Sequence, residues 1–258
     1  MSGFRAYYEN LESAAEGAEI VLSGDESRHL CGALRARGGD EVDLFNLSGE
    51  RARAKIAKPD SRAARLCILK KFAAAANSSE IILAQALPKG RAFDDIIALC
   101  VQLGVSKICP VLAQRCVVRL DAAEAAEKLA KWRRQLVEAV KQSANLSPVE
   151  ILAPMGFEEF LACARSFEAR KISKFIASLD AENPRPLLKA LRAAPSDMGG
   201  ACVFVGCEGD FTKQEYSAAY AEGFEPVSLG ENVLKSDIAA AFSMSVCSAF
   251  FADRQGGD

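Results

Sequence analysis

The chain has 258 residues and is 50% hydrophobic, which allows a sizeable core in one large or two unequal domains and excludes a disordered chain. Its formal net charge of −2 excludes a diffuse attraction of the whole chain to nucleic acid, so any RNA-binding surface must be local. The chain has nine cysteines but no CxxC pair, which predicts reduced thiols in the cytoplasm and no metal site. The amino terminus lacks the features of a signal peptide, and no run of about 18 apolar residues occurs, so we expect no export and no membrane contact.

Residues 1–72 predict a small, mostly β domain of the barrel or sandwich kind. Short alternating stretches are separated by turn signals at Ser23-Gly24-Asp25, Gly38-Gly39-Asp40 and Leu47-Ser48-Gly49. Further along, Arg51, Arg53 and Lys55 alternate and would project from one face of a strand. Two interpretations of these cations stay open, a solvated edge that resists aggregation and a surface for RNA phosphates.

The second predicted domain covers residues 73–258, since the small-residue run FAAAANSS at 72–79 marks a boundary. EIILAQAL at 80–87 is typical of a strand, and residues 91–105 predict a helix that Gly104 ends. KICPVL at 107–112 predicts the next strand. Asp121 and Glu124 then form a capping-box signal for a long helix that ends before Pro148 and places Trp132 in its core-facing stripe.

The carboxy-terminal part repeats the alternation of strands and helices. ACVFVG at 201–206 predicts a buried strand, Thr212 with Glu215 a capped helix that reaches Gly223, and FEPVSL at 224–229 another strand. The final segment, 237–251, is apolar on nearly every side, so other elements or another subunit must bury it. The pattern predicts an α/β domain with a parallel sheet covered on both faces.

Two loops follow the carboxyl ends of predicted parallel strands, at residues 206–211 and 229–237. Open α/β sheets bind ligands at this edge, and glycine lets a ligand approach the backbone closely. Glycine at a strand end is also simply a turn residue, so the loops alone do not define a ligand. The sequence contains no G-x-G-x-x-G, Walker A, H-E-x-x-H or G-x-S-x-G motif.

The order of motifs resembles the ribosomal RNA small-subunit methyltransferase E family from end to end. The resemblance depends on SRHLCGALRARGGDEVDLFN, LAQALPKGRAFDDIIALCVQLGVSKICPVLAQRCVVRL, KWRRQLVEAVKQSANLSPVEI, VFVGCEGDFTKQE and VSLGENVLKSDIAA. It implies a PUA-like RNA-binding barrel at 1–72, a SPOUT domain with a carboxy-terminal trefoil knot at 73–258, and a homodimer. It also implies S-adenosylmethionine as methyl donor and methylation of uridine N3 in the 16S ribosomal RNA of the small subunit.

The cofactor loops of that family read approximately G-P-E-G-G and L-G-x-R-x-L-R-x-E-T. Here Cys207 replaces the proline, Asp210 a glycine, and Asn232 and Lys235 two arginines, while Asp237 stands in place of a glutamate. Asp210 is tolerable because aspartate visits the left-handed region more readily than most residues. The cofactor positions that carry over are Gly206, Glu208, Gly209, Leu229, Gly230, Val233 and Leu234.

Methylation at uridine N3 requires loss of the imide proton, and a cation near the uracil oxygens would stabilise the resulting anion. Lys235 is the candidate for this catalytic role, with a surface or dimer-interface lysine as the alternative. Asp237 is a candidate base, or its carboxylate caps the final helix. The changed positions also leave open a rival function, a dimeric RNA-binding protein without efficient methyl transfer. A methyltransferase with another RNA target is the other alternative.

His29 is the single histidine and matches the histidine of the resembled family in the first domain. A structural hydrogen bond or an RNA contact is expected for it rather than catalysis. Arg35 lies in the same stretch and is either a phosphate contact or a solvated cation. The candidate RNA-binding residues are therefore His29, Arg35, Arg51, Arg53 and Lys55.

Overall fold

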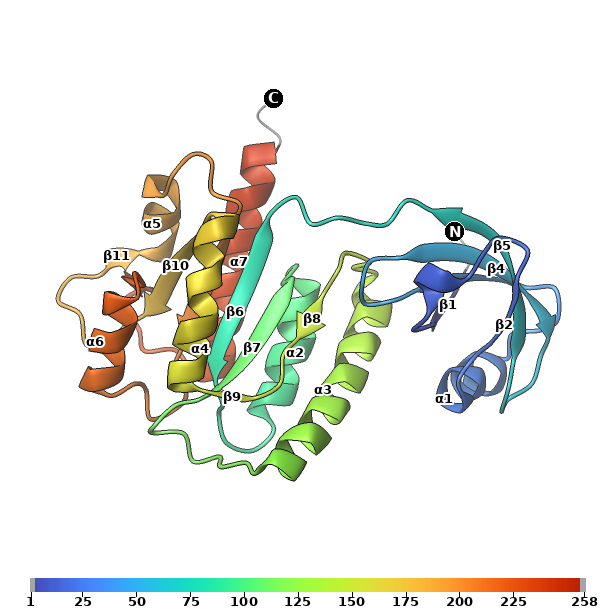
Figure 1. Ribbon diagram of the computed structural model, residues 1–258, viewed down its shortest axis with the longest axis horizontal. Helices are drawn as coiled ribbons and strands as arrows, with labels where there is room; N and C mark the ends of the chain where they lie inside the picture. Colours follow the sequence, from blue (N-terminus) through green and yellow to red (C-terminus); the bar gives the residue numbers. More distant parts are fainter. Residues whose placement is uncertain (1–2, 256–258) are drawn as a thin grey trace. The chain divides into compact units, whose positions relative to one another are not determined.

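The computed structural model describes residues 3–255, which form two compact units (Figure 1). The first unit runs to Asn77 and also takes in Val140–Val149, a segment that lies inside the second predicted domain. The second unit comprises Ser78–Ala139 and the chain from Glu150 onward. Each unit is described by itself below.

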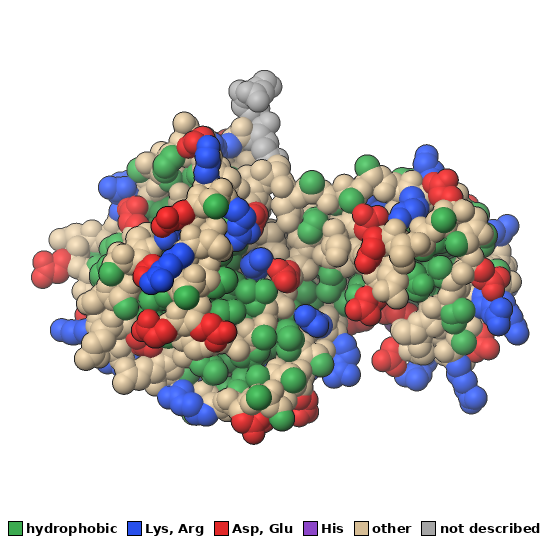
Figure 2. Space-filling model, in the orientation of Figure 1, with side chains coloured by type: hydrophobic (Ala, Val, Ile, Leu, Met, Phe, Trp, Pro, Cys, Tyr) green, Lys and Arg blue, Asp and Glu red, His purple; other side chains and the backbone are tan. Residues whose placement is uncertain are grey.

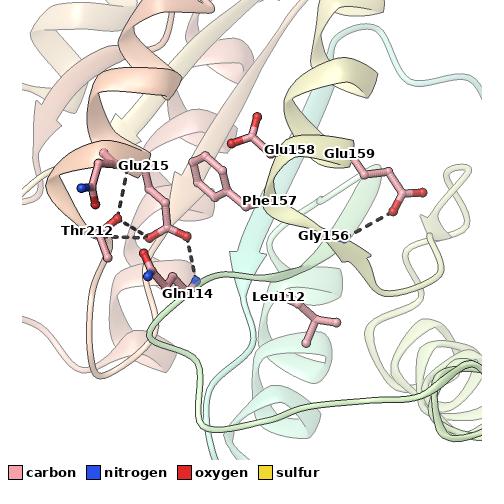
Figure 3. A pocket seen from close by; sticks show the side chains of 9 residues that line it. Leu112, Gln114, Gly156, Phe157, Glu158, Glu159, Thr212 and Glu215 are labelled. Atoms are coloured by element: carbon pink, nitrogen blue, oxygen red, sulfur yellow. Dashed lines mark hydrogen bonds between the residues drawn. The ribbon is translucent and has the colours of Figure 1, made fainter.

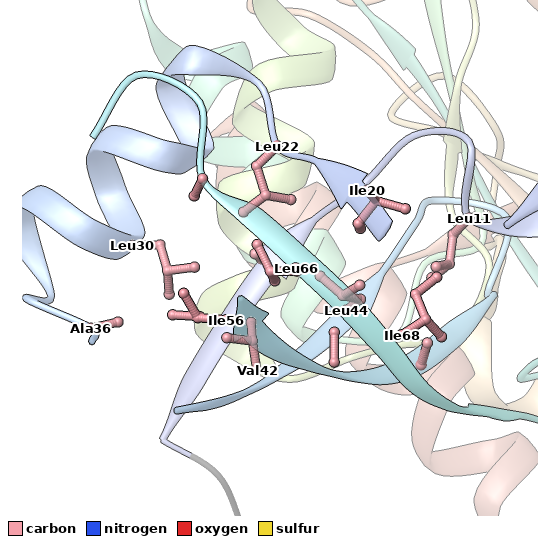
Figure 4. Close-up of a cluster of buried hydrophobic side chains, with 14 residues drawn as sticks. Leu11, Ile20, Leu22, Leu30, Ala36, Val42, Leu44, Ile56, Leu66 and Ile68 are labelled. Atoms are coloured by element: carbon pink, nitrogen blue, oxygen red, sulfur yellow. The ribbon is translucent and has the colours of Figure 1, made fainter. Parts of the chain in front are cut away.

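The first unit is a curled five-stranded sheet in the order β1-β3-β4-β5-β2. All of its strand pairs are antiparallel except β1 with β3. The sheet curls around a core of leucine, isoleucine, valine and alanine side chains, which Figure 4 shows gathered on its inner side. The prediction of a small β domain is confirmed. Its strands are β1 (Phe4–Tyr7), β2 (Glu19–Val21), β3 (Glu41–Phe45), β4 (Arg51–Lys58) and β5 (Arg65–Phe72).

A helical segment replaces the first of the three turns that the sequence analysis predicts. After the short 3₁₀ helix η1 (Leu11–Ser13) and strand β2, α1 (Gly24–Ser27) runs directly into the π-helical η2 (Arg28–Ala33). The hydroxyl of Ser23 accepts a hydrogen bond from the Glu26 amide at 3.3 Å, so it acts as a helix N-cap. Ser, Gly and Asp favour both turns and helix starts, and here packing of Leu30 into the core favours the helix.

A buried ion pair fixes the helical segment to the carboxy-terminal end of α3 (Ala122–Ser143). The side chains of Glu26 and Lys141 are 9% and 7% exposed, and the Lys141 ammonium donates to the Glu26 carboxylate. The other Glu26 oxygen accepts from the Tyr7 amide at 2.9 Å, and Arg5 donates to the Lys141 carbonyl at 3.1 Å. This pair joins β1, α1 and the last turn of α3 within the first unit.

The second unit is built on a parallel sheet in the order β11-β13-β10-β12-β6-β7-β8, with β9 also paired to β7. Every strand pair in it is parallel, as the sequence analysis predicts. The β6 residues 81–86 and the β12 residues 200–205 are buried. The strands are β6 (Glu80–Ala86), β7 (Lys107–Leu112), β8 (Glu150–Ile151), β9 (Met155–Gly156), β10 (Ile172–Ala177), β11 (Arg185–Pro186), β12 (Gly200–Val205) and β13 (Glu225–Ser228).

Helices cover both faces of this sheet (Figure 1). On one face, α7 (Ser236–Gln255) packs against β6 and β12 and is flanked by α2 (Ala92–Gln102) and α5 (Leu187–Ala193). Trp132 of α3 packs on Phe93 of α2 with ring centroids 4.5 Å apart, which confirms its core position. On the other face lie α4 (Phe157–Ala164), the 3₁₀ helix η3 (Arg165–Arg170) and α6 (Lys213–Ala221).

An aromatic cluster holds α4 and α6 to the sheet. Phe204 of β12 contacts Phe160 of α4 at 4.7 Å and Phe211, just before α6, at 4.6 Å between ring centroids. Both predicted capping boxes are present: Thr212 with Glu215 begins α6, and Asp121 with Glu124 begins α3. The cluster and the caps fix where the loop between β12 and α6 leaves the sheet.

Candidate functional site

A cavity of about 810 Å³ opens in the second unit at the carboxyl ends of β10, β12 and β13. The loops after these three strands form its walls, at the edge where open parallel sheets bind ligands. Gly209 is the one candidate cofactor or catalytic residue outside its lining. The cavity brings together the other predicted positions, namely Gly206, Glu208, Leu229, Gly230, Val233, Leu234, Lys235 and Asp237.

Two glycines in the walls are required by geometry. A Cβ on Gly206 would lie 2.7 Å from an Asp210 carboxylate oxygen, which is closer than real contacts allow. Gly230 has a φ of +128°, a conformation that residues with a side chain rarely adopt. Gly209 packs on the loop after β7, where an added Cβ would lie 3.0 Å from the Arg115 Cβ. Close packing therefore requires glycine at positions 206 and 209, whereas at Gly230 the space beside the backbone is empty and a ligand can approach closely.

Asp210 stands where the resembled family has a glycine, and the structure shows which contacts support an aspartate there. It adopts the left-handed region, with a φ of 56°. The Tyr216 hydroxyl lies 2.9 and 2.8 Å from its two carboxylate oxygens and donates to this carboxylate. Burial raises the pKa of Asp210, while the hydrogen bond from Tyr216 opposes that rise. The sequence analysis identified Asp210 but missed Tyr216, which lies in α6 and shows no motif of its own.

A buried glutamine connects the two predicted loops beneath the cavity. Gln85, at the end of β6, is fully buried, and its amide nitrogen lies 3.1 Å from the Gly206 carbonyl and 2.9 Å from the Ser236 hydroxyl. The Ser236 hydroxyl also donates to the Gly206 carbonyl at 3.0 Å. These hydrogen bonds fix the first turn of α7 to the loop after β12. The sequence spacing alone did not reveal this connection.

A third loop contributes to the cavity and was not predicted. Ser178 and Leu179 follow β10, whose sequence ISKFIA is a buried strand. The Ser178 hydroxyl lies 3.1 Å from that of Tyr220, and the Leu179 amide donates to the Tyr216 hydroxyl at 3.4 Å. The rule that ligands lie at the carboxyl ends of parallel strands would have found this loop once β10 was recognised.

The two candidate catalytic residues lie at the cavity wall near the start of α7. Lys235 is exposed, and Asp237 is half-buried in the first turn of the helix. A carboxylate there interacts favourably with the helix dipole, so both roles proposed for Asp237 stay open. On the opposite wall, the Lys89 amide donates to the Glu208 carboxylate at 3.3 Å, which orients this exposed side chain.

Cys207 in the cavity wall and Cys116 in the loop after β7 are both buried. The Cys116 thiol donates to the Val111 carbonyl at 3.8 Å. The influence of the Cys116 thiol, helped by the Gly209 amide, lowers the pKa of Cys207 to about 7, although burial opposes the shift. The influence of Cys207 and burial raise the pKa of Cys116.

The candidate RNA-binding residues all lie in the first unit. On β4, Arg51, Arg53 and Lys55 share the outer face while the alternate residues are buried, as predicted. Arg53 is paired with Asp43 at 2.5 Å and with Glu41 at 3.0 Å, which offsets much of its charge. Figure 2 accordingly shows cations and anions intermixed on the face that it presents.

The two remaining candidates lie beside the helical segment of this unit. His29 is half-buried within η2. Arg35 is exposed just after η2 and has a φ of 56°, in the left-handed region.

A second pocket of about 440 Å³ lies between α4 and α6, and none of the candidate cofactor, catalytic or RNA-binding residues lines it (Figure 3). The Glu215 carboxylate in it accepts hydrogen bonds from the Gln114 amide at 2.7 Å and the Thr212 amide at 2.9 Å. Its acceptors are thus used in capping α6 and holding the loop after β7. We therefore interpret the side chains of this pocket as structural rather than as a ligand-binding site.

Within residues 3–255, no group of three or more His, Cys, Asp or Glu side chains is placed to hold a metal ion. In the same described part of the chain, no helix combines the length and apolar character needed to cross a membrane.

The second unit is a parallel α/β unit with a cavity between glycine-containing loops at the carboxyl ends of its strands. Together with the separate curled β unit, it defines an α/β ligand-binding protein with an added β domain. Residues 75–248 match the RNA methyltransferase domain family, and residues 22–68 match the RNA methyltransferase PUA domain. The chain belongs to the RNA methyltransferase domain family, which confirms the resemblance drawn from its motifs.

Similar proteins agree with this assignment. The chain is 27% identical to ribosomal RNA small subunit methyltransferase E of Synechocystis, over 90% of this chain and 73% of that protein. A Neisseria gonorrhoeae protein of the same name, solved with bound S-adenosylmethionine, is 27% identical with a TM-score of 0.79, covering 97% of this chain and 96% of its own. A methyltransferase from Legionella pneumophila, also with this cofactor bound, is 26% identical with a TM-score of 0.82, covering 95% and 97%.

Proposed function

We propose that this protein uses S-adenosylmethionine to methylate uridine N3 in the 16S ribosomal RNA of the small subunit. The observation that carries the proposal is the single cavity that gathers eight of the nine candidate cofactor and catalytic residues from two separate loops. The names of the similar proteins, and the cofactor bound to two of them, support the same conclusion.

The cavity residues fit this cofactor. The volume of about 810 Å³ lies in the range typical of small-molecule sites, and Gly230 leaves the backbone open in the loop after β13. Leu229, Val233 and Leu234 would hold its apolar parts, while Glu208 offers a carboxylate for its polar groups. The cofactor supplies an electrophilic methyl group on its sulfonium.

The protein's own contribution is to prepare the uracil. Lys235 would stabilise the negative charge that develops on the uracil oxygens as the N3 proton leaves. Lysine lacks the planar fork of the arginine in the resembled family, so it would orient the base less well. Asp237 would accept the proton, or it would cap α7 and leave the proton to solvent.

The carboxy-terminal knot and the homodimer are part of the same proposal. After β13 the chain turns back, and α7 packs against β6 and β12. At the place where a knot would cross, Gln85 binds both Gly206 in the loop after β12 and Ser236 at the start of α7. One face of α7 exposes Ile238 (48%) and Phe242 (42%) at helical spacing, which supports a second copy as the covering partner. Nine free cysteines support a reducing, cytoplasmic location.

Calorimetric titration with S-adenosylmethionine, followed by single-turnover methyl transfer to small-subunit RNA, tests the proposal. We expect cofactor binding, and mass spectrometry of the digested RNA should place the methyl group on uridine N3. No binding at millimolar cofactor would overturn the enzymatic function. Cofactor and RNA binding without methyl transfer would instead support the second candidate, an RNA-binding dimer impaired by Asn232 and Lys235.

A further inference from the structure

Asp210 places a carboxylate in the wall of the cavity, and the proposed methyl transfer gives it no role. The residue lies in the loop after β12 and lines the cavity together with Gly206. Its Oδ1 atom lies so close to Gly206 that a Cβ added there would be 2.7 Å from it. The carboxylate is therefore beside the backbone of a predicted cofactor position. The resembled family has glycine at position 210, so this carboxylate is a feature of this chain rather than of that family.

Tyr216 of α6 holds this carboxylate in place. Its hydroxyl donates to the carboxylate and lies 2.9 and 2.8 Å from the two oxygens. Tyr216 is itself 2% exposed, and the Leu179 amide donates to its hydroxyl at 3.4 Å. Its ring also packs edge-on against Phe211, with ring centroids 5.4 Å apart. Because these contacts fix Tyr216, the Asp210 carboxylate has a fixed position at the cavity wall.

The protein supplies no counter-charge for Asp210. Within the described residues 3–255, no lysine or arginine forms an ion pair with this carboxylate. The hydrogen bond from Tyr216 comes from a neutral group, and half-burial of Asp210 removes part of the water that would solvate the charge. A cation that binds beside such a carboxylate interacts with it favourably.

The charged side chains of the cavity wall also favour a cationic ligand. The lining includes three carboxylates and two ammonium groups, those of Glu208, Asp210 and Asp237 and those of Lys89 and Lys235. Asn232, which also lines the cavity, is neutral where the resembled family has an arginine. Relative to that family, the wall has lost one positive charge at Asn232 and gained one negative charge at Asp210. Both changes act in the same direction, toward a ligand with a net positive charge.

We propose that Asp210 is a specificity-determining residue that makes the cavity prefer the cationic cofactor to its neutral product. This inference rests on the proposed function. S-adenosylmethionine carries a sulfonium cation, which becomes a neutral thioether in S-adenosylhomocysteine once the methyl group has been transferred. A carboxylate in the cavity wall therefore attracts the cofactor more strongly than the product. The protein would exchange product for fresh cofactor more readily and be less inhibited by product.

Calorimetric titration of the full-length protein with S-adenosylmethionine and, separately, with S-adenosylhomocysteine tests this preference without any methyl transfer. Asp210→Asn keeps the left-handed conformation and an oxygen that accepts from Tyr216, so it removes the charge alone. We expect this variant to bind S-adenosylmethionine about tenfold more weakly and S-adenosylhomocysteine with a change of less than about twofold. Asp210→Gly, which restores the residue of the resembled family, should change the ratio of the two Kd values in the same direction.

Asp180→Asn is the matched control, because Asp180 is exposed in the loop after β10 and lies outside the cavity lining. It should leave the ratio of the two Kd values unchanged within about twofold, since solvent screens an exposed charge. An unchanged ratio in Asp210→Asn, or an equal effect of Asp180→Asn, would overturn this inference and leave the proposed function standing. If the unmodified protein binds neither ligand, the proposed function fails and this inference fails with it.

Discussion

Asp210 combines a strained backbone with a carboxyl group whose pKa is raised by burial. Its folded-state pKa is raised, so its favourable contribution to folding is present below the unfolded pKa and is lost as the pH rises through the folded pKa. An asparagine side chain at this position would keep the left-handed conformation and accept from Tyr216 without a charge. We therefore expect Asp210→Asn to raise the melting temperature at neutral pH by about 2 °C, a small effect because the carboxyl is screened by solvent.

Thermal unfolding measured across pH tests this expectation. The advantage of Asp210→Asn should shrink as the pH falls toward the unfolded pKa of aspartate. Asp253→Asn, on the exposed part of α7, provides a control that should change little. A stability gain that grows as the pH falls would show that burial does not raise the pKa of Asp210.

Lys235 carries the proposed electrostatic role in methyl transfer. Lys235→Ala should leave cofactor affinity nearly intact but lower the single-turnover rate by about a hundredfold, because the cation acts mainly in the transition state. Asn232→Arg should raise the rate if the missing cation had impaired the enzyme. Transfer of labelled methyl to small-subunit RNA measures both, and a fully active Lys235→Ala protein would remove this lysine from the mechanism.

At the residue scale, the sequence located the cavity through glycine and strand-end rules, because backbone constraints leave local signatures. Gly206 and Gly230 were found in this way. Tyr216 and Gln85 were not, since their roles come from contacts that only the folded chain makes. The ion pairs of Arg53 were also hidden, because Asp43 and Glu41 face it only through the strand register.

Strand β4 presents the cations proposed to contact RNA. Arg51 and Lys55 are better test positions than Arg53, whose carboxylate partners would repel a glutamate. Arg51→Glu with Lys55→Glu should weaken binding of small-subunit RNA strongly and reduce the salt dependence by about one unit of slope per lost phosphate contact. Filter binding at several salt concentrations measures this. Arg53→Ala should have a much smaller effect, and unchanged affinity in the double variant would reject β4 as the RNA surface.

The ion pair of Glu26 and Lys141 holds α1 against the last turn of α3. Glu26→Gln leaves the Lys141 ammonium buried without its counter-charge, which typically costs about 3 kcal/mol. Asp25→Asn is the matched control, because its ion pair with Arg28 is 81% and 73% exposed and should contribute little. Urea unfolding of both variants makes the comparison, and equal stabilities would show that the buried pair is dispensable.

At the scale of elements, long periodic segments were predictable and short ambiguous ones were not. Helices α2 and α3 and strands β6, β7, β12 and β13 follow from apolar spacing and caps. The segment from α1 to η2 looked like a turn, because the same residue types begin helices. Strand β10 was not recognised, since its sequence includes Ser173 and Lys174, and Lys174 is 9% exposed only because the sheet and its neighbours enclose it.

For the whole molecule, the exposed apolar face of α7 predicts a homodimer. Phe242→Glu places a charge in that face, so it should shift the protein from dimer to monomer at micromolar concentration. Light scattering coupled to gel filtration measures the mass. Val21→Glu changes a comparably exposed apolar residue in the first unit and should leave the dimer intact. An unmodified protein that is monomeric would contradict the prediction directly.

The segment Val140–Val149 bears on how this protein can be divided. It returns to the first unit after the chain has already entered the second, and it brings Lys141 to Glu26 and the Val149 amide to the Leu47 carbonyl at 3.0 Å. A fragment that stops at Asn77 would therefore keep the buried glutamate and lose its cation. Neither unit is a contiguous module, so grafting the first unit onto another protein requires a covalent link to this second segment.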